Sequence, residues 1–197
     1  PNMTRLREIL AAGEIGDLIH VEANISAPGR NYAIHHWRSD PKECPAGSMT
    51  GLGVHMIDAL ISVMGQVDQV NAETRIRTVG EIISPVTFMT LRFLSGATGV
   101  FSTLFQTAPV WFIRVSGNRG WTSINDYDRL ETRKIGDKKH SIETFPKTDI
   151  ELAELEAFAT AIKGANPYPI SPDEAVHGTA VFEAIVRSVE TGQPVDV

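Results

Sequence analysis

The sequence predicts an α+β fold, in which one large, mainly antiparallel, open β-sheet carries helices on one face. Helical and strand patterns are segregated along the chain: a helix, a strand and a helix come first, a run of strands follows, and two helices end the chain. The turns between the central strands, such as Ser95-Gly96, Gly117-Asn118 and Gly136-Asp137, are short. Short turns favour antiparallel hairpins, whereas parallel neighbours need long crossover connections.

The N-terminal region predicts a helix, a strand and a long loop. Residues 4–12 place apolar side chains on one helical face, and Gly13 ends the helix. Residues 27–47 contain three prolines and little periodicity, and long ordered loops of this kind are often functional. Between them, residues 18–25 alternate as a half-buried strand does, with Leu18, His20, Glu22 and Asn24 on one face and Ile19, Val21, Ala23 and Ile25 on the other.

A second helix is predicted over residues 48–64, because apolar side chains recur there every four residues. Ser48 or Thr50 can cap its start, and Gly65 ends it. Strands are then predicted over residues 67–77, 86–94, 98–107, 112–117, 120–125, 129–135 and 139–145.

Two helices close the chain. The first covers residues 149–164, and its predicted buried side holds Leu152, Leu155, Phe158, Ala159 and Ile162. Ser171 caps the last helix, which has Pro172 at its first position and extends to about Thr191. Its apolar face includes Val176, Ala180, Ile185 and Val189.

So few helices can cover only one face of so large a sheet. The other face is therefore expected either to be wet or to meet a partner, and subunit association through the sheet is a natural hypothesis. The outward-facing candidates include several apolar side chains, namely Phe88, Phe93, Phe101, Leu104 and Phe105.

Composition indicates one soluble globular domain. The chain has 197 residues, 42% hydrophobic and 21% charged, with a formal net charge of −6, so it lacks the basic character of a nucleic-acid-binding protein. Its apolar runs are shorter than the roughly 20 residues that span a bilayer, and Pro1 to Arg7 do not resemble a signal peptide. The single cysteine, Cys44, fits a reducing cytoplasm. Because the chain begins at Pro1, we expect it to be a fragment of a longer protein.

One stretch carries the pattern of a reactive site. A polar aromatic loop, residues 36–41, is followed by a glycine-rich helix start, residues 46–58. Glycines at 47, 51 and 53 let a ligand or another backbone approach closely, and His55 follows Gly51 by about one turn. These are the parts of an acid–base site for a hydroxyl or carbonyl substrate. From chemistry alone, His55 can equally be a hydrogen-bonded core histidine.

The neighbouring residues also allow two interpretations. Arg38 can bind a carboxylate or phosphate with both arms of its guanidinium, or it can belong to a loop packed around Trp37. Asp58 can contact His55 three residues earlier, or it can pair with a neighbouring backbone group or arginine. No metal is expected, because the adjacent His35 and His36 point in different directions without a ligand cluster. Three further residues are candidates for the pocket mouth: Arg30, Asn31 and Tyr32. Cys44 and His177 are expected to be unreactive and structural, respectively.

The run GSMTGLGVHMID resembles the signature of the glucose–fructose oxidoreductase, inositol dehydrogenase and MocA family, a glycine-rich start followed by Asp-x-Gly-x-His-x-x-Asp. The loop WRSDP, the opening LREILAAGEIGDLIHVEA and the closing PYPISPDEAVHGTAVFEAIVRSVETGQPVDV are also similar to that family. The resemblance covers nearly the whole chain in several ordered blocks.

The resemblance implies a two-domain oxidoreductase of a sugar, polyol or related cyclic hydroxyl or carbonyl compound. Residues 1–197 correspond to its substrate-binding and oligomerising half, with a fold like the C-terminal domain of dihydrodipicolinate reductase, and residues 1–16 connect to a Rossmann half. That other half binds NAD or NADP and supplies a catalytic lysine in a Glu-Lys-Pro context. This chain has neither that context nor a G-x-G-x-x-G motif, so alone it is expected to be inactive. A homodimer or homotetramer is implied, without nucleic acid or membrane as a partner.

By position, the resemblance makes His55 the catalytic histidine, which exchanges the hydroxyl proton while hydride moves to or from the nicotinamide. Trp37 and Arg38 match a loop beside nicotinamide and substrate, so they are expected to contact both. The expected substrate-binding residues in the helix are Thr50, Gly51 and Asp58. Gly51 departs from the family pattern, which has an aspartate there. The departure allows three interpretations: a different substrate that needs room there, a site in which His55 and the lysine of the other half suffice, or an impaired or different activity. Thr50, Ser48 and Asp58 are candidates to compensate for the aspartate. An alternative is a non-catalytic binding or assembly module of the same fold, and a free-standing ligand-binding protein would require the chain to be complete.

Overall fold

A computed structural model describes residues 1–28, 37–79 and 82–197. Within these residues, nine strands form one sheet in the order β8-β7-β6-β5-β1-β4-β3-β2-β9. The strands are β1 (Leu18–Ala27), β2 (Val67–Val79), β3 (Ile82–Phe93), β4 (Thr98–Phe105), β5 (Val110–Gly117), β6 (Gly120–Asn125), β7 (Arg129–Lys134), β8 (Ser141–Thr144) and β9 (Val195–Asp196). The helical segments are α1 (Asn2–Ala11), η1 (Trp37–Ser39), η2 (Met49–Gly53), α2 (Val54–Met64), α3 (Ile150–Ile162) and α4 (Pro172–Thr191).

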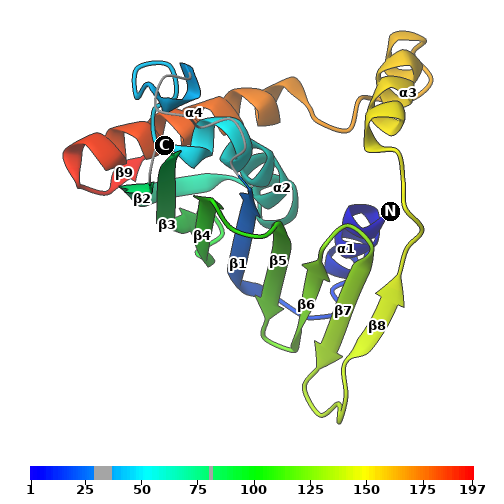
Figure 1. Ribbon diagram of the computed structural model, residues 1–197. Coiled ribbons are helices and arrows are strands. Elements are labelled where there is room, and N and C mark those ends of the chain that lie inside the picture. Colours follow the sequence, from blue (N-terminus) through cyan, green and yellow to red (C-terminus); the bar gives the residue numbers. More distant parts are fainter. Residues whose placement is uncertain (29–36, 80–81) are drawn as a thin grey trace.

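The sheet is open and mainly antiparallel, with three helices on one face, which confirms the predicted fold class (Figure 1). Helix α1 packs on β6 and β7, α2 on β1, and α4 on β2. The central strand β1 lies parallel to β4 and antiparallel to β5, and the long connection through α2, β2 and β3 makes that parallel pairing possible. Strand β9 escaped prediction because it has only two residues, which pair with Gln69 and Val70.

Strand β1 shows how the sheet separates a buried face from an open one. Val21, Ala23 and Ile25 are buried beneath the helices, whereas Glu22 and Asn24 lie on the open face, as the alternation predicts. Ile19 breaks the pattern and is exposed, because the pairing with β5 shifts register between Leu18 and His20. A register shift of one residue turns the preceding side chains to the other face.

The apolar candidates for the open face divide between both faces. Phe88 is exposed there, and Leu104 is half-buried on the same face. Phe93, Phe101 and Phe105 are buried, so these three candidates do not belong to the open face. The reason is the two-residue period of a strand: these three side chains share the parity of the buried positions in β3 and β4.

Helix α4 is the longest helix in the described part of the chain, and it packs on β2 near one edge of the sheet. The Ser171 hydroxyl accepts from the Glu174 amide while the Glu174 carboxylate accepts from the Ser171 amide, which is a complete capping box. Gly192 ends the helix in the left-handed region, with φ +65°. Ile185 is fully buried in the core as predicted, but Val176 is exposed in the first turns and does not contribute to it.

Helix α3 differs from its prediction. Asp149 caps it by accepting from the Leu152 amide at 3.0 Å, and the helix forms over the expected residues. Yet no residue of α3 is buried, so the predicted buried side does not face the core. The helix stands away from the sheet beyond the N-terminal end of α4 (Figure 1). None of the helices in the described part of the chain is long and apolar enough to cross a membrane.

The Ser188 hydroxyl joins α4 to the sheet, and its removal tests this anchoring. The fully buried hydroxyl accepts from the Ala72 amide of β2 at 2.9 Å and donates to the Gln193 carbonyl at 2.7 Å. Ser188→Ala leaves both groups without this partner, so we expect a loss of about 1–3 kcal/mol in the free energy of unfolding, measured by urea denaturation. Thr179→Ala on the exposed side of α4 is the control and should change it by less than about 0.5 kcal/mol. Equal effects of the two changes would contradict the anchoring.

Candidate functional site

The turn before α2 is fastened to the sheet at three points. Ala46 and Gly47 both have positive φ, at 56° and 59°. The Thr87 hydroxyl of β3 donates to the Ala46 carbonyl at 2.8 Å, and the buried Ser48 hydroxyl donates to the Thr103 carbonyl of β4 at 3.0 Å. Gly47 lies so close to Pro85 that an added Cβ would be 2.6 Å from the proline Cβ. The strands therefore fix where the helix begins.

The single helix predicted over residues 48–64 begins as a π-helical turn, η2, before it becomes α2. A Cβ at Gly53 would overlap the sulfur of Met49, so a larger residue there would require the buried methionine side chain to move. The Thr50 hydroxyl donates to the Pro45 carbonyl at 2.6 Å and closes the turn from the other side. Short π-helical segments are often found at functional sites, because they re-aim the side chains that follow.

His55 lies on the exposed side of the first turn of α2, whereas the next two residues, Met56 and Ile57, point into the core. The structure therefore excludes the alternative of a core histidine. Gly51 precedes it by four residues and Asp58 follows by three, so all three lie along one exposed helical face. Gly51 is exposed and adds no side chain to this face.

Asp58 lies between His55 and α4. The residue is exposed as a whole, but its carboxyl lies against α4, 3.1 Å from where a Cβ on Gly178 would be. Burial raises the pKa of the Asp58 carboxyl, the nearby His55 opposes this shift, and Glu174 adds to it. The Asp58 carboxyl and the His55 imidazole are thus near enough to interact electrostatically, as one of the two interpretations of Asp58 requires.

Trp37 and Arg38 form a stacked pair in η1. The Arg38 guanidinium carbon lies 4.2 Å from the centre of the Trp37 ring, and the tryptophan is 53% exposed. The tryptophan is therefore a surface residue rather than a buried hydrophobic residue around which the loop packs. A turn at Asp40, whose carbonyl accepts from the Cys44 amide at 2.8 Å, connects this pair to the anchored segment before α2.

Cys44 is buried in that turn. Burial raises the pKa of its thiol, and Arg38 opposes the shift. A buried thiol held in its protonated form is a poor nucleophile, which agrees with the expectation that Cys44 is unreactive. Five sequence candidates lie outside the described residues: Arg30, Asn31, Tyr32, His35 and His36. Among the residues that are described, no group of three or more histidine, cysteine, aspartate or glutamate side chains is arranged to hold a metal ion.

A groove of about 860 Å³ runs beside the α2 face, and sequence reasoning missed it. Val54 and Asp58 of α2 form one wall, Leu155 and Phe158 of α3 form another, and Phe182 lies on the α4 side. The sequence contained one signal for it, since Val54 and Asp58 flank His55 and are spaced one turn apart. Its walls come from three separate helices, and only the fold brings them together.

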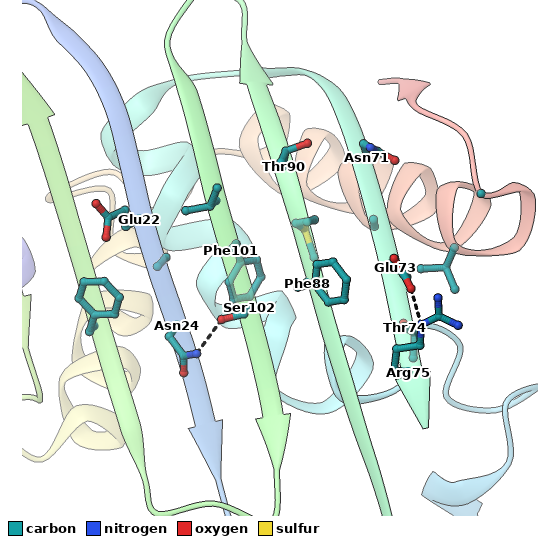
Figure 2. Close-up of a pocket in the computed structure, with 17 residues that line it drawn as sticks. Glu22, Asn24, Asn71, Glu73, Thr74, Arg75, Phe88, Thr90, Phe101 and Ser102 are labelled. Atoms are coloured by element: carbon teal, nitrogen blue, oxygen red, sulfur yellow. Dashed lines mark hydrogen bonds and ion pairs between the residues drawn. The ribbon is translucent and has the colours of Figure 1, made fainter. Parts of the chain in front are cut away.

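The open face of the sheet has a second hollow, of about 820 Å³ (Figure 2). Figure 2 shows Asn24 donating to Ser102, at 2.7 Å, and an ion pair between Glu73 and Arg75. Phe88 lies among these polar groups. This mixture of an exposed aromatic ring with polar side chains is typical of an interface surface rather than of a catalytic centre.

The family model described as the GFO/IDH/MocA C-terminal domain matches residues 3–123, which is more than half of the chain. The chain belongs to the GFO/IDH/MocA family. The match includes the anchored turn, the π-helical turn and all of α2.

Proteins similar to this chain agree with the fold. D-xylose 1-dehydrogenase (NADP+) 2 of Haloferax volcanii is 28% identical, with 95% of this chain and 59% of that protein covered. The NAD-binding oxidoreductase of Klebsiella pneumoniae superposes with a TM-score of 0.84 at 17% identity, over 100% of this chain and 63% of that one. The aldose–aldose oxidoreductase of Caulobacter crescentus, solved with glycerol, gives 0.82 at 20% identity, over 99% and 60%. The chain thus spans about three fifths of the length of these relatives.

His177 has a structural role within this family domain, as the sequence indicated. Its Nε2 atom accepts a hydrogen bond from the Val67 amide at 2.9 Å, which joins α4 to the first residue of β2. Burial lowers the pKa of the imidazole below its ordinary value. The accepting nitrogen must be unprotonated, so the folded domain favours neutral His177.

This arrangement predicts a pH dependence of stability. The unfolded chain takes up a proton at His177 near its ordinary value of 6.5 while the folded domain resists it, so the free energy of unfolding should fall as pH decreases below about 6.5. His177→Gln keeps an acceptor without a titrating group and should reduce the difference between about pH 7.5 and about pH 5.5, measured by urea denaturation. His140→Gln, at an exposed site, is the control and should leave the difference as in the parent chain. A parent-like pH difference in His177→Gln would refute this role.

Proposed function

We propose that this chain is the substrate-binding and subunit-associating half of an NAD(P)-dependent oxidoreductase that acts on a sugar, polyol or related cyclic hydroxyl or carbonyl compound. In this proposal residues 1–16 connect it to a nucleotide-binding half, and residues 1–197 alone are inactive. The observation that carries the proposal is the exposed His55 beside the bare Gly51, in a chain of the GFO/IDH/MocA family. The names of the xylose dehydrogenase and the aldose–aldose oxidoreductase support the substrate class.

The residues of the α2 face suit an acid–base role. An imidazole can take up and release a proton near neutral pH, and His55 is open to a ligand. When His55 takes the hydroxyl proton of a substrate, the nearby Asp58 carboxylate stabilises the positive charge of the imidazolium. The same attraction is the one by which His55 opposes the rise in the pKa of Asp58. Gly51 leaves room for a substrate ring against the helix. Thr50 donates its proton to Pro45, so it can offer a substrate hydroxyl only its acceptor lone pairs.

A nicotinamide, when bound, would supply the acceptor or donor of hydride at the substrate carbon. The residues present fit such a group, because Trp37 is 53% exposed and offers part of a planar ring, and the exposed Gly51 adds no side chain near His55. In this proposal Trp37 and Arg38 contact the nicotinamide and substrate, and Arg38 adds a positive charge for an anionic group. Whether the cofactor is NAD or NADP depends on residues of the other half. The single buried thiol of Cys44 supports a reducing, cytoplasmic setting.

Replacement of His55 tests the catalytic role. In the full-length polypeptide, His55→Asn should lower kcat/KM for xylose or a related sugar by about 10²–10⁴-fold, the usual contribution of a general acid or base. The fold should survive, since the side chain is exposed. The matched control is His140→Asn, a second exposed histidine, which should retain activity. Near-normal turnover in His55→Asn would favour the alternative of a non-catalytic binding or assembly module.

The open face of the sheet is proposed to join subunits of a homodimer or homotetramer. Phe88 and Val100 are 44% and 41% exposed there, and Phe112 lies in the same hollow (Figure 2). Polar partners such as Asn24 and Ser102 surround them. A surface of this composition can exclude water at its centre and satisfy polar groups at its edge.

Phe88→Asp in the full-length protein tests this interface. A charge at its centre should shift the protein from an oligomer towards a monomer in light scattering, because an unpaired carboxylate there would lose water. Ile135→Asp introduces the same charge at an exposed apolar position in the turn after β7 and should leave the mass unchanged. An unchanged mass in Phe88→Asp would place the interface elsewhere.

A further inference from the structure

We infer that the exposed apolar face of α3, together with the groove between α2, α3 and α4, is the docking surface for the nucleotide-binding half of the same polypeptide. Docking there would bring that half against the α2 face that carries His55. The inference rests on the proposed function for the existence of that half. Beyond the proposed function, the inference states where the nucleotide-binding half binds and which side chains hold it.

The first support is the exposure of apolar side chains along α3. Leu155, Phe158 and Ile162 are 66%, 56% and 71% exposed, and they recur at the three- and four-residue spacing that places them on one helical face. Leu152 lies on the same side and is also more than half exposed. Soluble monomers rarely present a continuous apolar stripe of this kind, so α3 is built to pack against something.

The second support is that α3 has little to hold it as a helix by itself. It has 13 residues, and isolated helices of that length are marginal in water even for favourable sequences. The Asp149 cap helps at one end. On its flank, Phe158 meets the Tyr168 ring edge-on at 6.1 Å, and the Tyr168 hydroxyl donates to Glu154 at 3.3 Å. These contacts connect only the side of α3 that lines the groove to the rest of the domain, and the apolar side chains around Ile162 remain exposed to solvent.

The third support is the position of the N-terminal helix. A smaller cavity of about 210 Å³ is lined by Met3 and Arg7 of α1, and it shares Asp58 and Ile170 with the larger groove. Helix α1 and the α3 groove are therefore neighbours, and the N-terminus lies on the side of the domain from which α3 projects (Figure 1). The relatives are longer than this chain, with about two fifths of the xylose dehydrogenase outside the match. A half joined through α1 would arrive beside the α3 surface.

The fourth support connects the surface to chemistry. Val54 and Asp58, the α2 residues that line the groove, stand one residue before and three residues after His55. Anything seated in the groove would contact the helix immediately next to the imidazole. The exposed Glu154 lines the α3 side of the groove, so the docking half should present apolar side chains together with a lysine or arginine opposite this carboxylate.

Leu155→Asp in the full-length polypeptide tests the inference, with hydrogen exchange of the α3 amides and steady-state kinetics as the measurements. In the parent protein, α3 amides should exchange at least about tenfold more slowly than in the variant. The variant should also lose about tenfold or more in kcat/KM, since the two halves would no longer be held in register. Ala153→Asp, which places the same charge on the opposite side of the helix, should leave both measurements unchanged.

The outcomes separate this inference from the proposed function. If His55→Asn abolishes activity but Leu155→Asp changes neither exchange nor turnover, the docking surface is wrong while the enzyme assignment stands. If the full-length protein has no oxidoreductase activity, slow exchange of α3 that Leu155→Asp releases still supports docking. If protection of α3 in the parent protein falls on dilution, a second copy occupies the surface and the inference is overturned.

Discussion

The anchoring of the turn before α2 is the constraint on which the candidate site depends. The hydroxyls of Thr87 and Ser48 connect this turn to β3 and β4, and Gly47 lets it approach Pro85 without a side chain between them. The π-helical turn that follows then sets the rotation of α2. With that rotation, Met56 and Ile57 fill the core while His55 remains outside. The position of the imidazole is therefore fixed by the sheet rather than by the loop alone.

The same sheet separates the domain into surfaces with different roles. One face is sealed by α1, α2 and α4 and holds the core, and the other presents Phe88 and Val100 among polar groups. Helix α3 belongs to neither face, and its apolar stripe lies beyond the N-terminal end of α4 (Figure 1). In the proposed function, these two incompletely covered apolar surfaces bind two partners: a second subunit at the sheet, and a nucleotide-binding half at α3.

Much of this could be predicted from the sequence, because the relevant signals are local. Capping by Ser171, the end of α2 at Gly65 and the alternation in β1 all depend on neighbours in the chain. Period alone could not say which side of a strand meets the helices, so it could not separate the buried Phe93, Phe101 and Phe105 from the exposed Phe88. For α3 the pattern correctly predicted a helix, but apolar spacing does not reveal whether the surface that covers those side chains lies within the same domain. The groove beside Asp58 could not be predicted from the sequence either, because its walls come from three helices that only the fold brings together.

Chemical rescue tests the central claim most directly. In the full-length protein, His55→Gly removes the imidazole from an exposed helical face on which Gly51 already leaves space. If His55 exchanges the substrate proton, added imidazole should restore part of the lost turnover in a saturable manner, because a free base can occupy the vacated position. His140→Gly should show no such response. If the folded His55→Gly variant stays inactive at all imidazole concentrations, or is fully active without imidazole, the acid–base role of His55 is contradicted.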